Sequence, residues 1–369
     1  MGVRWTRRLQ GGVAVAGLSI VAVGAVAVAF DGSRPARSTR EASPRAVVAV
    51  HAQFYRDARS SLAPLLVHLS QQSQLFSQLL QNGGSVGAGV AELARTWTED
   101  AATARDLVGR LLAPPSARPA QTLYRLAASL YVESARTLAA ATASPTPLEE
   151  VRAARRLQLL GDSVFDAGHR RLVPSTDDGT VPVERPPTAV VPDFAAAGLA
   201  PAAADHAAGI PAGNARHRLG IVAQQTATWL SGGPLPAGGP ELAAAELRSV
   251  SDALRAGSGP TAVSEADLAP LRLSALVEAE AVRGPAPSDG ARRLHLLAAA
   301  LWAAGTEAES GGVDAADGVF PLGGLDVTLL NGGGLFNGHP PALKPGDPPD
   351  KGVPGGLPSL TAGLPGMGG

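Results

Sequence analysis

An internal repeat places the strongest constraint on how this chain can fold. The segment ARRLQLLGDSVFDAG at residues 154–168 returns as ARRLHLLAAALWAAG at residues 291–305, with eight of fifteen positions identical. Both copies keep an arginine pair and a final glycine, and an aromatic residue, Phe165 or Trp302, occupies the same place. Self-similarity of this kind is typical of a duplicated structural unit. The sequence therefore predicts two related helical modules.

Three weaker correspondences lie upstream of this repeat and keep the same order. They pair Gln71, Gln72 and Phe76 with Gln224, Gln225 and Trp229; residues 91–93 with residues 245–247; and Leu126, Ser129, Val132 and Glu133 with Leu271, Ser274, Val277 and Glu278. Preserved order with drifting offsets is what two diverging copies would show. The alternative is convergence between alanine-rich amphipathic helices.

The first thirty residues indicate contact with a membrane. Arg4, Arg7 and Arg8 precede an uncharged run over residues 11–30, and a helix of about 20 apolar residues is long enough to cross a bilayer. We favour a retained transmembrane anchor within residues 1–30, with the basic tail in the cytoplasm and the rest of the chain outside. The alternative is a signal peptide cleaved after Ala29, because Ala27 and Ala29 form a small-x-small site.

The remaining sequence divides by composition and periodicity. Residues 31–45 are rich in Ser, Pro and Arg and predict a flexible stalk. Apolar residues at helical spacing over 46–172 predict a first four-helix bundle, with helices near 47–81, 86–111, 119–142 and 147–172. Residues 173–201 form a Pro-rich linker.

A second bundle is predicted over residues 202–310. Its expected helices span 214–231, 240–256, 264–283 and 288–309, and its faces carry more alanine than those of the first bundle. The Gly/Pro-rich stretch 311–369 predicts a disordered low-complexity tail. Seven residues of this stretch are apolar enough either to lie along a bundle or to meet a partner: Leu322, Leu325, Val327, Leu329, Leu330, Leu335 and Phe336. The fold class expected for the chain is all-α.

Composition excludes several classes of function. The chain has no cysteine, which rules out disulfides, thiol catalysis and cysteine-ligated zinc or iron–sulfur sites. A net charge of −1 and the lack of a basic stretch interleaved with aromatics argue against nucleic-acid binding. Only two lysines accompany abundant Ala, Gly and Pro, a composition typical of bacteria with GC-rich genomes.

The best polar constellation is Asp162, Asp166 and His169. Spacings of four and three place all three on one helix face, as in half of a helix-bundle metal site. The other half has no obvious source, and the repeat replaces the three residues with Ala299, Ala303 and Thr306. We therefore expect a solvated face in which Asp162 and Asp166 pair with arginines such as Arg155 or Arg170.

Other motifs favour structural roles. The Gly-x-Ser-x-Gly pattern at residues 83–87 lies between two expected helices, not on the strand-to-helix turn that a serine nucleophile requires. Arginine pairs recur at residues 155–156 and 292–293. They favour structural salt bridges, and contact with anionic lipid or wall polymer is the alternative. Trp97, Trp229 and Trp302 fall at core positions.

These patterns lead to a prediction of function. We expect no catalytic, cofactor-binding or metal-binding residue, and a non-enzymatic binding or scaffold protein acting outside the cytoplasmic membrane. Its expected partners are that membrane, through residues 11–30, and an unidentified protein or cell-envelope component. The alternative is a metal- or ligand-binding sensor or enzyme with a site around Asp162, Asp166 and His169. A small apolar ligand between the alanine-rich faces is a third possibility.

Overall fold

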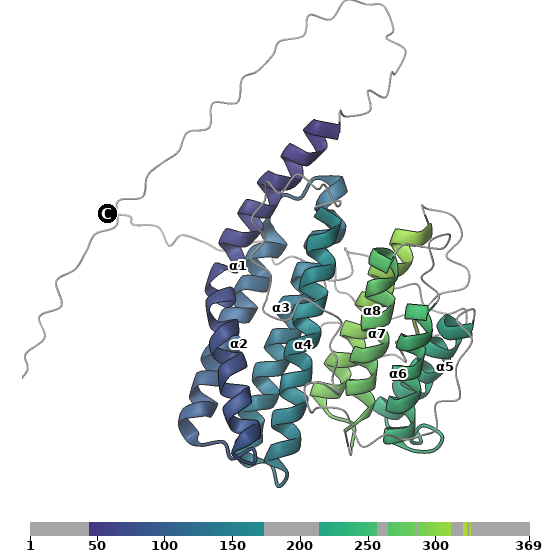
Figure 1. Ribbon diagram of the computed structural model, residues 1–369. Helices are drawn as coiled ribbons and strands as arrows, with labels where there is room; N and C mark the ends of the chain where they lie inside the picture. The colour runs from purple at the N-terminus through teal and green to yellow at the C-terminus, as the bar shows by residue number, and fades with distance from the viewer. Residues whose placement is uncertain are drawn as a thin grey trace, which may run out of the picture. The chain divides into compact units, whose positions relative to one another are not determined.

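The computed structural model describes residues 44–172, 214–256, 265–284, 286–310, 320–322 and 325. Across these ranges the regular structure is helical, with eight α-helices and no strand (Figure 1). The all-α prediction is confirmed for this part of the chain. The expected anchor at 1–30, most of the stalk at 31–45 and the linker at 173–201 lie outside the described residues.

The first helical set follows the predicted boundaries closely. Its members are α1 (Pro44–Gln81), α2 (Ala88–Arg110), α3 (Arg118–Ala140) and α4 (Pro147–Leu172), with short 3₁₀ turns before and after α3. Pro64 stands inside α1 on its exposed face, so the helix continues through the proline. α4 begins at Pro147, directly after Thr146, and proline is favoured at the first position of a helix.

The turn between α1 and α2 requires glycine at two positions. Gly83 and Gly84 have φ of 72° and 78°, in the left-handed region that side chains with a Cβ rarely adopt. A Cβ on Gly84 would also lie 2.4 Å from the Cα of Leu148 at the start of α4. The glycine therefore lets this turn close against α4, and Ser85 sits in a helix–helix turn with no strand beside it.

The second helical set contains four shorter helices. They are α5 (Ala215–Leu230), α6 (Pro240–Ala256), α7 (Glu265–Val282) and α8 (Asp289–Ser310), each within one residue of its predicted bounds. Pro270 lies inside α7, near its N-terminus. Glycines at 232, 238 and 239 adopt positive φ in the connection between α5 and α6.

The two sets pack in the same pattern and also contact each other. Within the first set α1 packs on α2 and α4, and α3 packs between α2 and α4; within the second, α5 packs on α6 and α8, and α7 packs between α6 and α8. Across the sets, α3 contacts α8 and α4 contacts α7. One hydrophobic core includes residues of all eight helices, so the two sets share part of their interior.

Close approach of α4 to α3 depends on Gly161. A Cβ at this position would stand 2.6 Å from Cε1 of the buried Tyr131 ring. Alanine would force the tyrosine aside, and overpacking of this kind costs about 1–3 kcal/mol. Gly161→Ala is therefore expected to lower the free energy of unfolding by that amount, as measured by denaturant titration.

Gly220 supplies the matched control for that substitution. It also lies inside a helix, α5, but a Cβ there would meet no atom within 4 Å. Gly220→Ala should raise stability by about 0.5–1 kcal/mol, because alanine loses less backbone entropy on folding. Equal effects of the two substitutions would contradict the packing described for Gly161.

Candidate functional site

The three residues singled out on α4 are all buried. Asp162, Asp166 and His169 expose 1%, 3% and 3% of their surface, so the expectation that they form a solvated face is wrong. The face they occupy packs against α3 and α1, because the first set closes around α4. Buried carboxylates must be paired or neutralised, and the structure gives the two aspartates different partners.

Asp162 is held by a phenol from α3. The Tyr131 hydroxyl donates a hydrogen bond of 2.7 Å to Oδ1 of Asp162, and the tyrosine is fully buried. Burial raises the pKa of Tyr131 well above its usual value, and the neighbouring Asp162 charge and hydrogen bond raise it further. The phenol therefore stays neutral and serves as a fixed donor to the carboxylate.

Asp166 lies one turn further along α4 and is only partly satisfied. Arg170 pairs with its Oδ2 at 2.6 Å, as the sequence predicted. Its Oδ1 and the hydroxyl of Tyr124 on α3 are both buried and make no hydrogen bond within the described part of the chain. Burial raises the pKa of Tyr124, and Tyr55 and Asp166 add to the increase.

His169 completes this polar face on the side of α1. Its ring meets that of Tyr55 edge to face, with ring centroids 4.9 Å apart. Among the described residues, no three His, Asp or Glu side chains gather closely enough to hold a metal ion. The face therefore brings carboxylate, phenol and imidazole groups together without forming a set of three metal ligands among the described residues.

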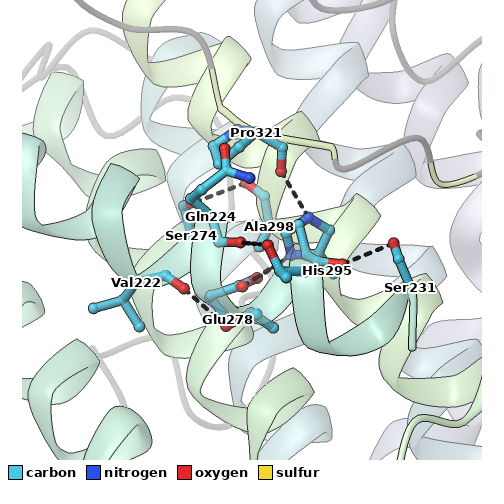
Figure 2. Close-up of polar contacts among 11 residues, drawn as sticks. Val222, Gln224, Ser231, Ser274, Glu278, His295, Ala298 and Pro321 are labelled. Atoms are coloured by element: carbon cyan, nitrogen blue, oxygen red, sulfur yellow. Dashed lines mark hydrogen bonds and ion pairs between the residues drawn. The ribbon is translucent and has the colours of Figure 1, made fainter. Parts of the chain in front are cut away.

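A second buried cluster, which the sequence analysis did not single out, lies in the second set. His295 on α8 and Glu278 on α7 are both fully buried. The His295 Nδ1 lies 2.8 and 3.0 Å from the two carboxylate oxygens of Glu278, and its Nε2 lies 2.9 Å from the carbonyl oxygen of Pro321. Figure 2 shows the imidazole between these two partners.

The protonation of His295 follows from its partners. A carbonyl oxygen only accepts, so Nε2 must donate to Pro321, and a carboxylate favours a second donor at Nδ1. Burial alone would lower the pKa of His295, but the Glu278 charge and the two hydrogen bonds outweigh it, and the pKa is raised. The pair is therefore an imidazolium and a carboxylate inside the protein.

This ion pair fixes a short segment beyond α8. Phe320, Pro321 and Leu322 are buried, and the Phe320 ring lies 5.3 Å from the ring of His295 and 5.9 Å from that of Trp302. Leu325 packs partly buried against the same core. Leu322 and Leu325 therefore contact the helices, whereas the other apolar residues of this stretch, from Val327 to Phe336, lie outside the described residues.

Two ionic clusters join the first helical set to the second. Glu280 on α7 accepts hydrogen bonds from Arg156 on α4 and from Arg283, at 2.9 Å each. On the other side of the contact, Glu133 on α3 accepts from Arg293 on α8 at 2.8 Å and from Arg136 at 2.7 Å. The salt bridges predicted for the repeated arginine pairs are confirmed at Arg156 and Arg293.

The sequence repeat contained part of the evidence for the cluster around His295 and Glu278. Glu278 appears in the upstream correspondence with Glu133, but His295 replaces Gln158 within the repeat, so the histidine looked like a divergent position. Its partner Pro321 lies 26 residues away, in a stretch without helical periodicity. Only the three-dimensional contact reveals the pair.

The described residues form two similarly packed sets of four helices, with buried charges between them. The chain matches no protein-family model, and it is similar to no curated protein and to no solved structure.

Proposed function

We propose that the two helical sets descend from one duplicated unit. Arg155 and Arg292, equivalent in the repeat, both donate to the first helix of their own set: Arg155 to the Ser73 hydroxyl on α1, and Arg292 to the Leu230 carbonyl on α5. The identical packing order of the helices supports the same view.

The repeated glycines support the duplication independently. A Cβ on Gly168 would stand 3.1 Å from the Cβ of Leu123 on α3, and one on Gly305 would stand 2.6 Å from Leu271 on α7. Equivalent glycines thus allow equivalent helices to approach. The reciprocal clusters at Arg156 and Arg293 fit an approximate two-fold relation between the sets.

We infer that the protein is a non-enzymatic binding or scaffold protein, anchored in or exported across the cytoplasmic membrane and acting outside it. One observation favours the non-enzymatic role: the buried charges of the described helices are used to hold helices together. Glu278, Glu280 and Glu133 each bond a cation from another helix, and both His295 nitrogens are engaged. Groups held in this way stabilise the packing of one helix on another.

The proposed anchor rests on residues 11–30 and on the arginines before them. Those residues lie outside the described part of the chain. Within the described part, no helix is both long and apolar enough to span a bilayer. The folded helices would then be the exported portion, and their partner a protein or cell-envelope component.

Membrane extraction and mass determination test the anchor. Full-length chain expressed in bacteria should stay in the membrane pellet after alkaline carbonate washing, and protease added to spheroplasts should digest the helical sets. A mature form beginning at Phe30 would instead favour cleavage after Ala29. Soluble chain that retains Met1 and resists external protease would refute export.

A second candidate function is a ligand sensor in the first set. It rests on the buried Oδ1 of Asp166 and the Tyr124 hydroxyl, two polar atoms without a hydrogen-bond partner among the described residues. Such groups favour a small polar guest or a bound water. This candidate function places its site at the residues predicted for it, Asp162, Asp166 and His169.

Elemental analysis and native mass spectrometry of the purified chain separate the two candidates. A stoichiometric metal or small molecule that disappears in Asp166→Ala but persists in Asp57→Ala, an exposed aspartate on α1, would favour the sensor. Chain without such a guest would favour the binding or scaffold role.

A further inference from the structure

One end of the first helical set is marked by two contacts of the His51 side chain. His51, in the second turn of α1, lies 3.0 Å from the Leu172 carbonyl at the end of α4 and 2.9 Å from the Ser116 hydroxyl between α2 and α3. The start of α1, the end of α4 and the loop at residues 111–114 therefore share this end (Figure 1). The chain from residues 1–43 enters at the same place, because α1 begins at Pro44.

The loop at residues 111–114 presents an apolar side chain to solvent. Leu112 is 99% exposed, the most exposed large apolar residue of the described chain. Leu107, one turn before the end of α2, is also exposed. A leucine left fully in water gains none of the free energy that its burial would release. An exposed leucine at the tip of a loop is therefore suited to insertion into an apolar surface.

The charges beside Leu112 favour an anionic partner. Arg110 and Arg118 flank the loop, are exposed, and form no ion pair with a described residue. At the opposite end of the set, α4 begins with two acidic residues, Glu149 and Glu150. The arginines near that opposite end, Arg95 and Arg152, are paired with Glu92 and Glu149, so the uncompensated positive charge lies at the end where α1 begins.

We propose that this end of the first set lies on the anionic phospholipid surface, with Leu112 inserted at the headgroup boundary and Arg110 and Arg118 at the phosphates. The inference rests on the anchor proposed above. Residues 31–43 can reach no more than about 45 Å even when fully extended, so an anchor ending at Phe30 keeps this end close to the bilayer. Leucine with flanking arginines is a combination that interfacial segments use.

Site-specific fluorescence tests the proposal on the full-length chain. The protein has no cysteine, so Leu112→Cys carries a single environment-sensitive label such as NBD. In mixed phosphatidylcholine–phosphatidylglycerol vesicles the label should emit at shorter wavelength and be quenched by lipids with spin-labelled acyl chains. Val67→Cys, which is exposed and lies about 24 Å from His51 along α1, should show neither change.

Charge reversal distinguishes lipid attraction from simple proximity. Each arginine should favour the membrane-bound position about fivefold, so Arg110→Glu with Arg118→Glu should weaken contact by about 25-fold or more. Arg95→Glu with Arg152→Glu, the same change near the opposite end, should leave it intact. Pure phosphatidylcholine should reproduce the loss.

Carbonate extraction of the same vesicles distinguishes failure of the Leu112 surface contact from failure of the membrane anchor. An extraction-resistant chain whose Leu112 label remains aqueous would overturn the surface contact and leave the anchor standing. A Leu112 label that shifts while the chain is washed off would contradict the anchor alone. A shift that depends on protein concentration without vesicles would assign the loop to a second copy and overturn the proposal.

Discussion

Replacing His295 with leucine is expected to lower the free energy of unfolding by about 3–5 kcal/mol, the usual cost of removing one partner from a buried ion pair. Glu278 is fully buried and both its oxygens face the imidazole. Without His295 its charge would be uncompensated, and the Pro321 carbonyl would lose its donor. Denaturant unfolding of the full chain measures the loss.

Glu278→Gln is the matched variant for this experiment. A glutamine amide can donate to Nδ1 of a neutral imidazole, which still donates to Pro321 through Nε2. The cost should therefore be about 1–2 kcal/mol, close to that of one hydrogen bond. A His295→Leu variant as stable as Glu278→Gln would show that the ion pair is not buried as described.

The same pair gives stability a dependence on pH. Because the folded pKa of His295 is raised, folding binds its proton more tightly. Its contribution is complete below the usual histidine pKa, about 6.5, and falls as pH rises through the folded pKa. The difference between the wild type and Glu278→Gln should shrink over that range.

The upper pH limit of that measurement is set by tyrosines. Burial raises the pKa of Tyr124 and Tyr131 above the usual value, so both phenols stay neutral in the folded chain and ionise in the unfolded chain at about pH 10. Stability from this source is lost above that pH. The histidine comparison therefore belongs below about pH 9.5.

Helix positions were predictable because their signals are local. Apolar periodicity and stop residues place all eight helices within about three residues of their observed ends, as at α6, Pro240–Ala256, where prediction and structure coincide. Pro64 shows the limit of such signals. From sequence alone, Pro64 is equally compatible with the start of a new helix and with a kink in a continuous one. In the structure α1 continues through Pro64 and packs along α2 and α4.

Pairings between distant residues were much less accessible. Asp162, Asp166 and His169 were correctly placed on one face, but their burial depends on how α4 packs against α3 and α1. The sequence favoured solvent for this face because carboxylates are usually exposed. The Tyr131 hydroxyl that satisfies Asp162 lies 31 residues away, and no local pattern links the two.

The contact between the two helical sets supplies the second large effect. Arg156 and Glu280 are almost fully buried, and Arg156 contributes its Nε to both carboxylate oxygens. Arg156→Met is expected to cost about 3 kcal/mol, the lower end of the range for breaking a buried pair, because Arg283 still bonds Glu280. Thermal and denaturant unfolding both measure this change.

The reciprocal cluster provides the comparison that makes the result interpretable. Arg293 and Arg136 are more exposed around Glu133, so Arg293→Met should cost about 1–2 kcal/mol, since a solvated charge loses less when its partner is removed. The triple variant Arg156→Met with Glu280→Met and Arg283→Met should recover most of the single loss, because the charges of the cluster are then gone and Arg283 is not left without its carboxylate. If the triple variant were less stable than Arg156→Met, the pair would not be the source of the cost, and the interface between α4 and α7 would depend on another contact.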